Sequence, residues 1–254
     1  MIIPILTTRQ REILEFLYVG ATRKEIASSL NLSPETVKMH TKNILDKFDA
    51  TSIRDGFKFI SQYITYYGSA GLGYQTFLKN IYHRYEIGPD LITCKVRRLS
   101  EGYVVHGPLK EHVYSIGGTN DILSNVKINN EVPRNLETSG AFINYKMAST
   151  PPLRDGEEFT RDLSFDAHSI NEQKLHQSSI IIGTPVAKVI LEVVFPRGIP
   201  DYINGSVIKG VNQSNLKGEK NVTIVENETS YIVEILFPDS EQQYSIDWKF
   251  DTNY

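Results

Sequence analysis

The stretch Leu6–Ile60 constrains the fold more than any other part of this 254-residue chain. Three segments in it carry apolar residues at helical spacing, and each follows a Ser or Thr that can cap a helix. The first is predicted to begin at Thr7 or Thr8 and the second after Thr22. Gly20 suits the end of the first, because glycine readily takes a positive φ. These signals predict a compact helical unit at the start of the chain.

The third segment, residues 34–48, carries the clearest functional signal. Ser33 is predicted to cap it, and Pro34 takes the first helical position, where its missing N–H costs nothing. Lys38 and Lys42 lie one turn apart on its polar side. Taken alone, the segment fits an amphipathic surface helix better. Two preceding short helices and the small residue Ala27 at their crossing instead favour a helix-turn-helix whose third helix enters the major groove of DNA.

The same residues resemble the LuxR-type helix-turn-helix, without gaps, over about fifty-five residues. The resemblance rests on groups such as Lys24-Glu-Ile-Ala27, Ser33-x-x-Thr36-Val-Lys38-x-His40 and Asn43-Ile-Leu45. It implies a four-helix module that reads DNA as a symmetric dimer and often dimerises through its fourth helix. The predicted DNA-binding residues are Lys24, Ser33, Glu35, Thr36, Lys38, Met39, Lys42, Asn43 and Lys47.

Two positions depart from the family pattern. Gln10 stands where the family usually has Glu, and Ile53 stands where an Arg is usual after the third helix. His40 occupies a family position that we assign to packing and hydrogen bonding more than to base reading. A local ion pair at Gln10 is therefore expected to be absent, and the anchoring of the fourth helix is expected to differ from the family pattern.

The fourth helix is predicted to run from Thr51 or Ser52 to Tyr66 or Tyr67. It carries more apolar side chains than one small module can cover, which favours contact with a partner chain or the next domain. The alternative is that it packs entirely on its own module. The predicted dimer or domain interface consists of Ile53, Phe57, Ile60, Tyr63, Ile64 and Tyr67.

Residues 68–73, with three glycines and a serine, are predicted to link a helix-turn-helix domain at 1–67 to a second domain at 74–254. The net charge of the chain is −3, but residues 1–67 hold nine Lys/Arg against seven Asp/Glu. Residues 68–254 hold eighteen against twenty-three. The mild positive excess therefore coincides with the predicted DNA-binding unit.

Alternating apolar and polar residues dominate after position 90. The strongest predicted strands are 188–195, 231–237 and 244–250, and the first two end in Phe-Pro. Residues 74–85 fit either a short helix or a first strand. Roughly ten short strands without helical crossovers predict an α+β two-domain protein with a C-terminal antiparallel β-sandwich, Ig-like or jelly-roll-like.

The second domain offers few chemical motifs. Cys94 is the only cysteine, so no disulfide within the chain can form, and its histidines lack metal-binding spacing. Arg97 and Arg98 could meet a phosphate-bearing ligand, although a solvated strand edge fits better. No catalytic residue, metal or cofactor is predicted, and the chain is expected not to be an enzyme. Without a signal peptide or an apolar run long enough to span a membrane, it is expected to be cytoplasmic.

These observations favour a sequence-specific DNA-binding transcription regulator that acts as a homodimer on double-stranded DNA. Its β-sandwich would sense an unidentified ligand or mediate assembly with another protein. The alternative is a protein-interaction adaptor that uses both domains as docking surfaces, which the acidic balance of the whole chain mildly favours.

Overall fold

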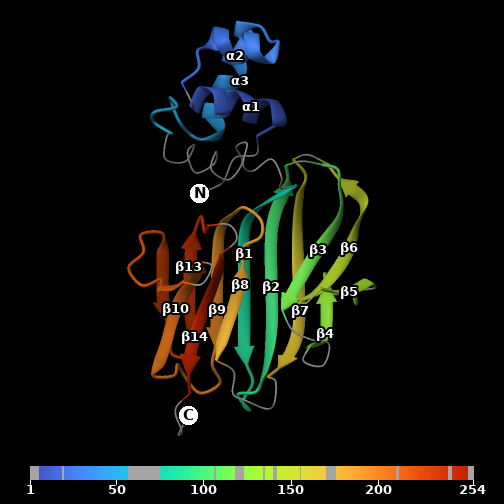
Figure 1. Ribbon diagram of the computed structural model, residues 1–254, viewed down its shortest axis with the longest axis vertical. Helices are drawn as coiled ribbons and strands as arrows, with labels where there is room; N and C mark the ends of the chain where they lie inside the picture. Colours follow the sequence, from blue (N-terminus) through green and yellow to red (C-terminus); the bar gives the residue numbers. More distant parts are fainter. Residues whose placement is uncertain are drawn as a thin grey trace.

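The fold is described from a computed structural model. The residues it describes are 6–18, 20–56, 75–105, 107–117, 123–133, 135–139, 142–154, 156–169, 176–209, 212–239 and 242–250. We call residues 6–56 the helical module and residues 75–250 the β-rich part. In Figure 1 the helical module lies at one end of the β-rich part.

The helical module contains three helices: α1 Thr8–Tyr18, α2 Arg23–Leu30 and α3 Pro34–Lys47. Their apolar sides converge on a shared core that includes Ile13, Leu14, Ile26, Val37 and Ile44, all fully buried. The helical spacing of these residues in the sequence is what places them on facing sides.

The predicted four-helix module is wrong for the residues that are described. After α3, residues 51–56 form bends and turns, where the fourth helix was expected to begin. The side chain of Asp55 accepts hydrogen bonds from the backbone N–H and the hydroxyl of Thr51, at 2.8 and 3.0 Å. The N–H groups of Asp55 and Gly56 bond the hydroxyl and the carbonyl of Ser52, at 3.1 and 3.0 Å, so the described residues make a single turn. The rest of the predicted helix, from Phe57 to Tyr67, and the predicted linker at 68–73 lie outside the described residues.

The β-rich part contains long and short strands in almost unbroken succession. They are β1 Thr76–Ile87, β2 Thr93–Val104, β3 Leu109–Gly117, β4 Leu123–Ile128, β5 Asn135–Ser139, β6 Phe142–Leu153, β7 Glu158–His168, β8 Gln177–Ile181, β9 Val186–Val194, β10 Tyr202–Lys209, β11 Asn212–Asn215, β12 Val222–Glu226, β13 Ser230–Leu236 and β14 Gln243–Lys249. The three strongest predicted strands are confirmed as β9, β13 and β14. The ambiguous segment 74–85 forms most of β1.

The described strands form three sheets (Figure 1). The largest has seven strands in the order β12-β13-β9-β1-β2-β7-β4, the second has the order β11-β10-β14-β8, and the third has the order β3-β6-β5. β1 pairs antiparallel with β2 but parallel with β9.

The predicted antiparallel sandwich of the Ig or jelly-roll kind is therefore also wrong. The parallel β1–β9 pair makes the large sheet mixed, and the remaining strands divide into two further sheets rather than one. Alternation of apolar and polar residues reports which face of a strand is buried. It does not report the partner or the direction of pairing, which depend on residues about one hundred positions away.

Both smaller sheets pack against one face of the seven-stranded sheet, which we call its inner face. One core joins side chains of β1, β9 and β13 to those of β8, β10 and β14, with Trp248 almost completely buried against Phe195. A second core joins β2 and β7 to β3 and β6. Register places Cys94 and Val96 of β2 opposite Ile87 and Tyr85 of β1, so the two cores share this face.

Replacing Ile246 by alanine tests the first core. Ile246 is fully buried on β14, so Ile246→Ala is expected to lower the free energy of unfolding by about 2–5 kcal/mol. Urea unfolding can be followed by the fluorescence of Trp248, the only tryptophan. Ile181→Ala is the control, because Ile181 is 51% exposed and should change stability by less than about 0.5 kcal/mol. Equal effects of the two substitutions would contradict this packing.

Candidate nucleic-acid interface

The start of α3 is held by its own side chains. The hydroxyl of Ser33 accepts a hydrogen bond from the backbone N–H of Thr36 at 3.0 Å, and Pro34 occupies the first turn. The predicted cap is therefore confirmed. Because α3 begins on the surface, the positive end of its helix dipole faces solvent.

The turn between α2 and α3 has the geometry of a tight helical corner. Asn31 ends α2 in the left-handed conformation, with φ of 53°, as a short turn before the next helix requires. Ala27 is buried where the two helices meet, and the small side chain lets α3 approach. Thr22 and Glu25 form a capping box at the start of α2. These elements hold α3 at a defined angle across α2.

The polar side of α3 is open to solvent. Met39 is 54% exposed, although it is large and apolar, and the side chain of Lys38 is 60% exposed. Of the nine predicted DNA-binding residues, Thr36 is half-buried and the others are exposed: Lys24, Ser33, Glu35, Lys38, Met39, Lys42, Asn43 and Lys47. The structure thus brings most of the predicted set onto the outward side of α3.

A shallow groove of about 620 Å³ follows this side of α3. Lys38, Met39 and Lys42 line it, together with Arg23 from the start of α2. Arg23 was not among the predicted residues. Arg23 directly follows the Thr22 cap, and the N-terminus of α2 lies next to the outward side of α3. This position in the sequence is the signal that could have identified Arg23. Glu35 lies 3.8 Å from Lys38 and offsets part of that positive charge.

Lys47 has a second partner inside the module. Its amine donates a hydrogen bond of 2.9 Å to the side-chain oxygen of Gln10, which also accepts from the backbone N–H of Thr7. Partial burial lowers the pKa of Lys47. A neutral amide at position 10 therefore ties α3 to α1 by a hydrogen bond where an acidic residue would make an ion pair.

The opposite side of the module meets the β-rich part. The guanidinium of Arg11 is buried and donates a 2.6 Å hydrogen bond to the backbone carbonyl of Val105, just beyond β2. One hydrophobic cluster contains the helical core and also Phe77, Tyr103 and Ala187 of the β-rich part. Of the predicted interface residues, Ile53 packs against this cluster, and Phe57, Ile60, Tyr63, Ile64 and Tyr67 lie outside the described residues.

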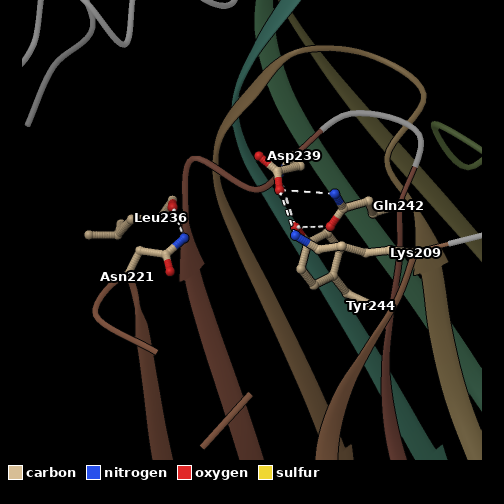
Figure 2. A network of polar contacts seen from close by, with 6 residues as sticks. All are labelled: Lys209, Asn221, Leu236, Asp239, Gln242 and Tyr244. Atoms are coloured by element: carbon tan, nitrogen blue, oxygen red, sulfur yellow. Dashed lines mark hydrogen bonds and ion pairs between the residues drawn. The ribbon is translucent and has the colours of Figure 1, made fainter. Parts of the chain in front are cut away.

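Phe237 joins this cluster from the loop that follows β13. Its backbone has φ of 49°, and its N–H bonds the carbonyl of Ala187 at 2.7 Å. Polar contacts hold the surrounding loop, as Figure 2 shows. The carboxylate of Asp239 accepts hydrogen bonds from Lys209 and Gln242, at 3.2 and 2.9 Å. The backbone N–H of Asp239 donates a hydrogen bond to the hydroxyl of Tyr244. This network fixes the loop that presents Phe237 to the cluster.

Three helices with a capped, outward-facing third helix define a helix-turn-helix unit. Residues 4–58 match the model of the family described as bacterial regulatory proteins, luxR family, so this region is a LuxR-type helix-turn-helix domain. The resemblance predicted from the sequence is confirmed for these residues.

Curated relatives match the same region. The nitrate/nitrite response regulator NarP of Escherichia coli is 44% identical over 48 residues, which are 19% of this chain and 22% of NarP. The spore germination protein GerE of Bacillus subtilis is 48% identical over 44 residues, 17% of this chain and 60% of GerE. The chain thus spans less than two thirds of the length of each.

Solved structures resemble about two thirds of the chain at low identity. A protease structure from Parabacteroides distasonis has 10% identity and a TM-score of 0.44, covering 68% of this chain and 40% of that one. Leukotriene A4 hydrolase of Saccharomyces cerevisiae has 9% identity and a TM-score of 0.39, covering 67% and 29%. A two-domain M1 zinc metallopeptidase scores 0.38 with 12% identity, covering 68% and 43%.

The expectation that the chain is not an enzyme is not upheld, since the solved structures that resemble it are described as a protease, a metallopeptidase and a hydrolase. TM-scores this low assign no reaction to the chain. Within the described residues, no group of three or more His, Cys, Asp or Glu side chains is placed to hold a metal ion. No described helix is long and apolar enough to cross a membrane.

Replacing Arg11 by methionine tests the contact between the module and the β-rich part. Arg11→Met leaves the buried carbonyl of Val105 without this donor, and the free energy of unfolding is expected to fall by about 1–3 kcal/mol. Amide hydrogen exchange should also become faster in α1. Arg9→Met is the control, since Arg9 makes only an exposed ion pair with Glu12 on the same helix. Unchanged exchange in α1 of Arg11→Met would show that this contact does not hold the module.

Proposed function

We propose that the chain is a sequence-specific DNA-binding transcription regulator. The observation that carries the proposal is the outward side of α3 in a LuxR-type domain, where Lys38, Met39 and Lys42 line one exposed groove. NarP and GerE, the relatives named above, are a response regulator and a spore germination protein. The third helix of a helix-turn-helix enters the major groove with its N-terminal half.

The exposed residues divide into two proposed roles. Lys24, Lys38 and Lys42 neutralise phosphates, and the positive end of the α3 dipole at Ser33 and Thr36 attracts a phosphate oxygen. Asn43 and Met39 face base edges, where an amide can pair with adenine and an apolar side chain can meet a thymine methyl group. Lys47 can contact the DNA backbone only after its hydrogen bond to Gln10 breaks, so it is the weakest of the nine proposed contacts.

The proposed organisation has two domains, 1–67 and 74–254, with residues 68–73 between them. The β-rich part senses a ligand or mediates assembly, and two copies bind paired half-sites. A homodimer is proposed because one module contacts too few base pairs for tight specific binding.

Removing the two central lysines of α3 tests the DNA-binding proposal. Lys38→Ala with Lys42→Ala is expected to weaken binding to promoter DNA from the protein's own locus by at least about tenfold, because two phosphate contacts are lost. The slope of log affinity against log salt should become shallower by about two. Electrophoretic mobility shifts at several salt concentrations measure both quantities.

A matched pair of lysines in the β-rich part supplies the control. Lys110→Ala with Lys217→Ala removes the same charge from exposed positions distant in sequence from α3, and should leave the salt slope unchanged. If both double variants bind DNA as wild type does, α3 is not the reading helix. Absence of any salt-dependent shift in wild type would favour the protein-interaction adaptor instead.

The homodimer proposal predicts a dependence on paired half-sites. A DNA duplex with two symmetric half-sites about 10 bp apart should bind on the order of 100-fold more tightly than one with a single half-site, because the second module binds at high effective concentration. Titration of both duplexes measures this ratio. Equal affinities would show that the chain binds as a monomer.

A further inference from the structure

A cleft of about 670 Å³ opens between β3 and β8, which are the edge strands of the two smaller sheets. Ser115 and Asn144 line one side, and Ser179, Ile180 and Gln243 line the other. Arg98 reaches the cleft from β2, in the inner face of the seven-stranded sheet. The cleft therefore combines polar groups, an apolar wall and one cation.

Arg98 is deeply buried yet keeps accessible surface, as expected for a side chain that lines an internal cleft. Burial lowers its pKa to about 10. Its Nε donates a long hydrogen bond of 3.5 Å to Nδ1 of His83, the opposing residue on β1. Burial and the adjacent Arg98 hold the pKa of His83 well below its usual range, so the ring is neutral and adds no second positive charge.

Arg161 is a second, half-buried cation beside Arg98. It opposes Ser100 on β2, while Arg98 opposes Leu163 on β7, so the two arginines are diagonal neighbours on the inner face. The guanidinium of Arg161 lies 4.2 Å from the ring centre of Phe159, and its Nε is buried without a hydrogen-bond partner among the described residues. Burial lowers its pKa to about 10 as well.

Arginines on the outer face of the same sheet have carboxylate partners. Arg97, next to Arg98 in sequence, makes two hydrogen bonds to the carboxylate of Asp162, at 3.0 and 2.7 Å. Arg84 bonds the carboxylate of Glu192 at 3.0 Å. Neither Arg98 nor Arg161 forms an ion pair with a carboxylate in the described ranges. A buried cation without a counter-charge is costly, and an anion bound in the cleft would offset that cost.

We propose that this cleft binds a small organic anion whose carboxylate or phosphate group pairs with the guanidinium of Arg98. The planar fork of arginine donates two parallel hydrogen bonds to either group. The volume of the cleft lies within the range of small-molecule sites. Arg161 raises the positive potential beside it, Ser179 and Asn144 offer further hydrogen bonds, and Ile180 packs against the organic part. The site does not depend on whether α3 reads DNA.

Thermal unfolding in the presence of simple anions tests the site. The probes are sodium phosphate and sodium acetate, compared with sodium chloride at equal ionic strength, with Trp248 fluorescence as the readout. The Tm of wild type should rise by about 3 °C at a probe concentration ten times its dissociation constant. A rise with phosphate alone or acetate alone identifies the preferred group. Equal Tm values in all three salts would overturn the proposal.

Two variants and one control locate the effect. Arg98→Met should abolish the anion-dependent rise while leaving the Tm in chloride unchanged or higher, because an uncompensated buried charge is removed. Arg97→Met, one residue away on the outer face, should keep the rise. Gly183→Phe should block the cleft without touching Arg98, since a Cβ at Gly183 meets no atom within 4 Å. If Arg98→Met does not fold, Gly183→Phe decides, and a wild-type response in either variant would overturn the proposal.

Discussion

The pairing of β1 on both of its sides is the constraint on which the β-rich part depends. β1 is antiparallel to β2, which follows it directly, and parallel to β9, about one hundred residues later. Two parallel strands cannot be joined by a hairpin, so the chain must leave the large sheet after β1 and β2 and cross back to place β9 beside β1. The intervening chain from β2 to β8 contributes to all three sheets. The inner face and the cleft between β3 and β8 are consequences of this return.

Local signals in the sequence predicted the first three helices, because such signals act within a few residues, whereas the predicted four-helix module was wrong. Ser33 caps α3, and the alternation over residues 244–250 does form a strand with a buried side, β14. Pairing partners could not be predicted in the same way. The sandwich prediction failed because the third sheet and the parallel β1–β9 pair depend on contacts between distant segments. Alternation of apolar and polar residues along a strand does not indicate such contacts.

The two adjacent arginines illustrate the same limit at the scale of one site. The sequence favoured a solvated strand edge for Arg97 and Arg98, but β2 lies inside the sheet, between β1 and β7. Alternation along a strand then sends the two guanidiniums to opposite faces. The outer one meets Asp162 in a partly exposed ion pair, which contributes about 0–1 kcal/mol. The inner one keeps some accessible surface but has no such partner in the described ranges, so its charge is left uncompensated.

The contact between Arg11 and Val105 also limits how the β-rich part can act on the helical module. It uses α1 and the end of β2, whereas the side chains of Lys38 and Met39 on α3 remain more than half exposed. Among the described residues, the β-rich part therefore does not cover the proposed reading side. Control by direct occlusion of α3 does not fit this arrangement. In the proposed homodimer, a module held at a fixed angle would instead pass a change in the β-rich part to the spacing of the two modules, and the proposed binding to paired half-sites depends on that spacing.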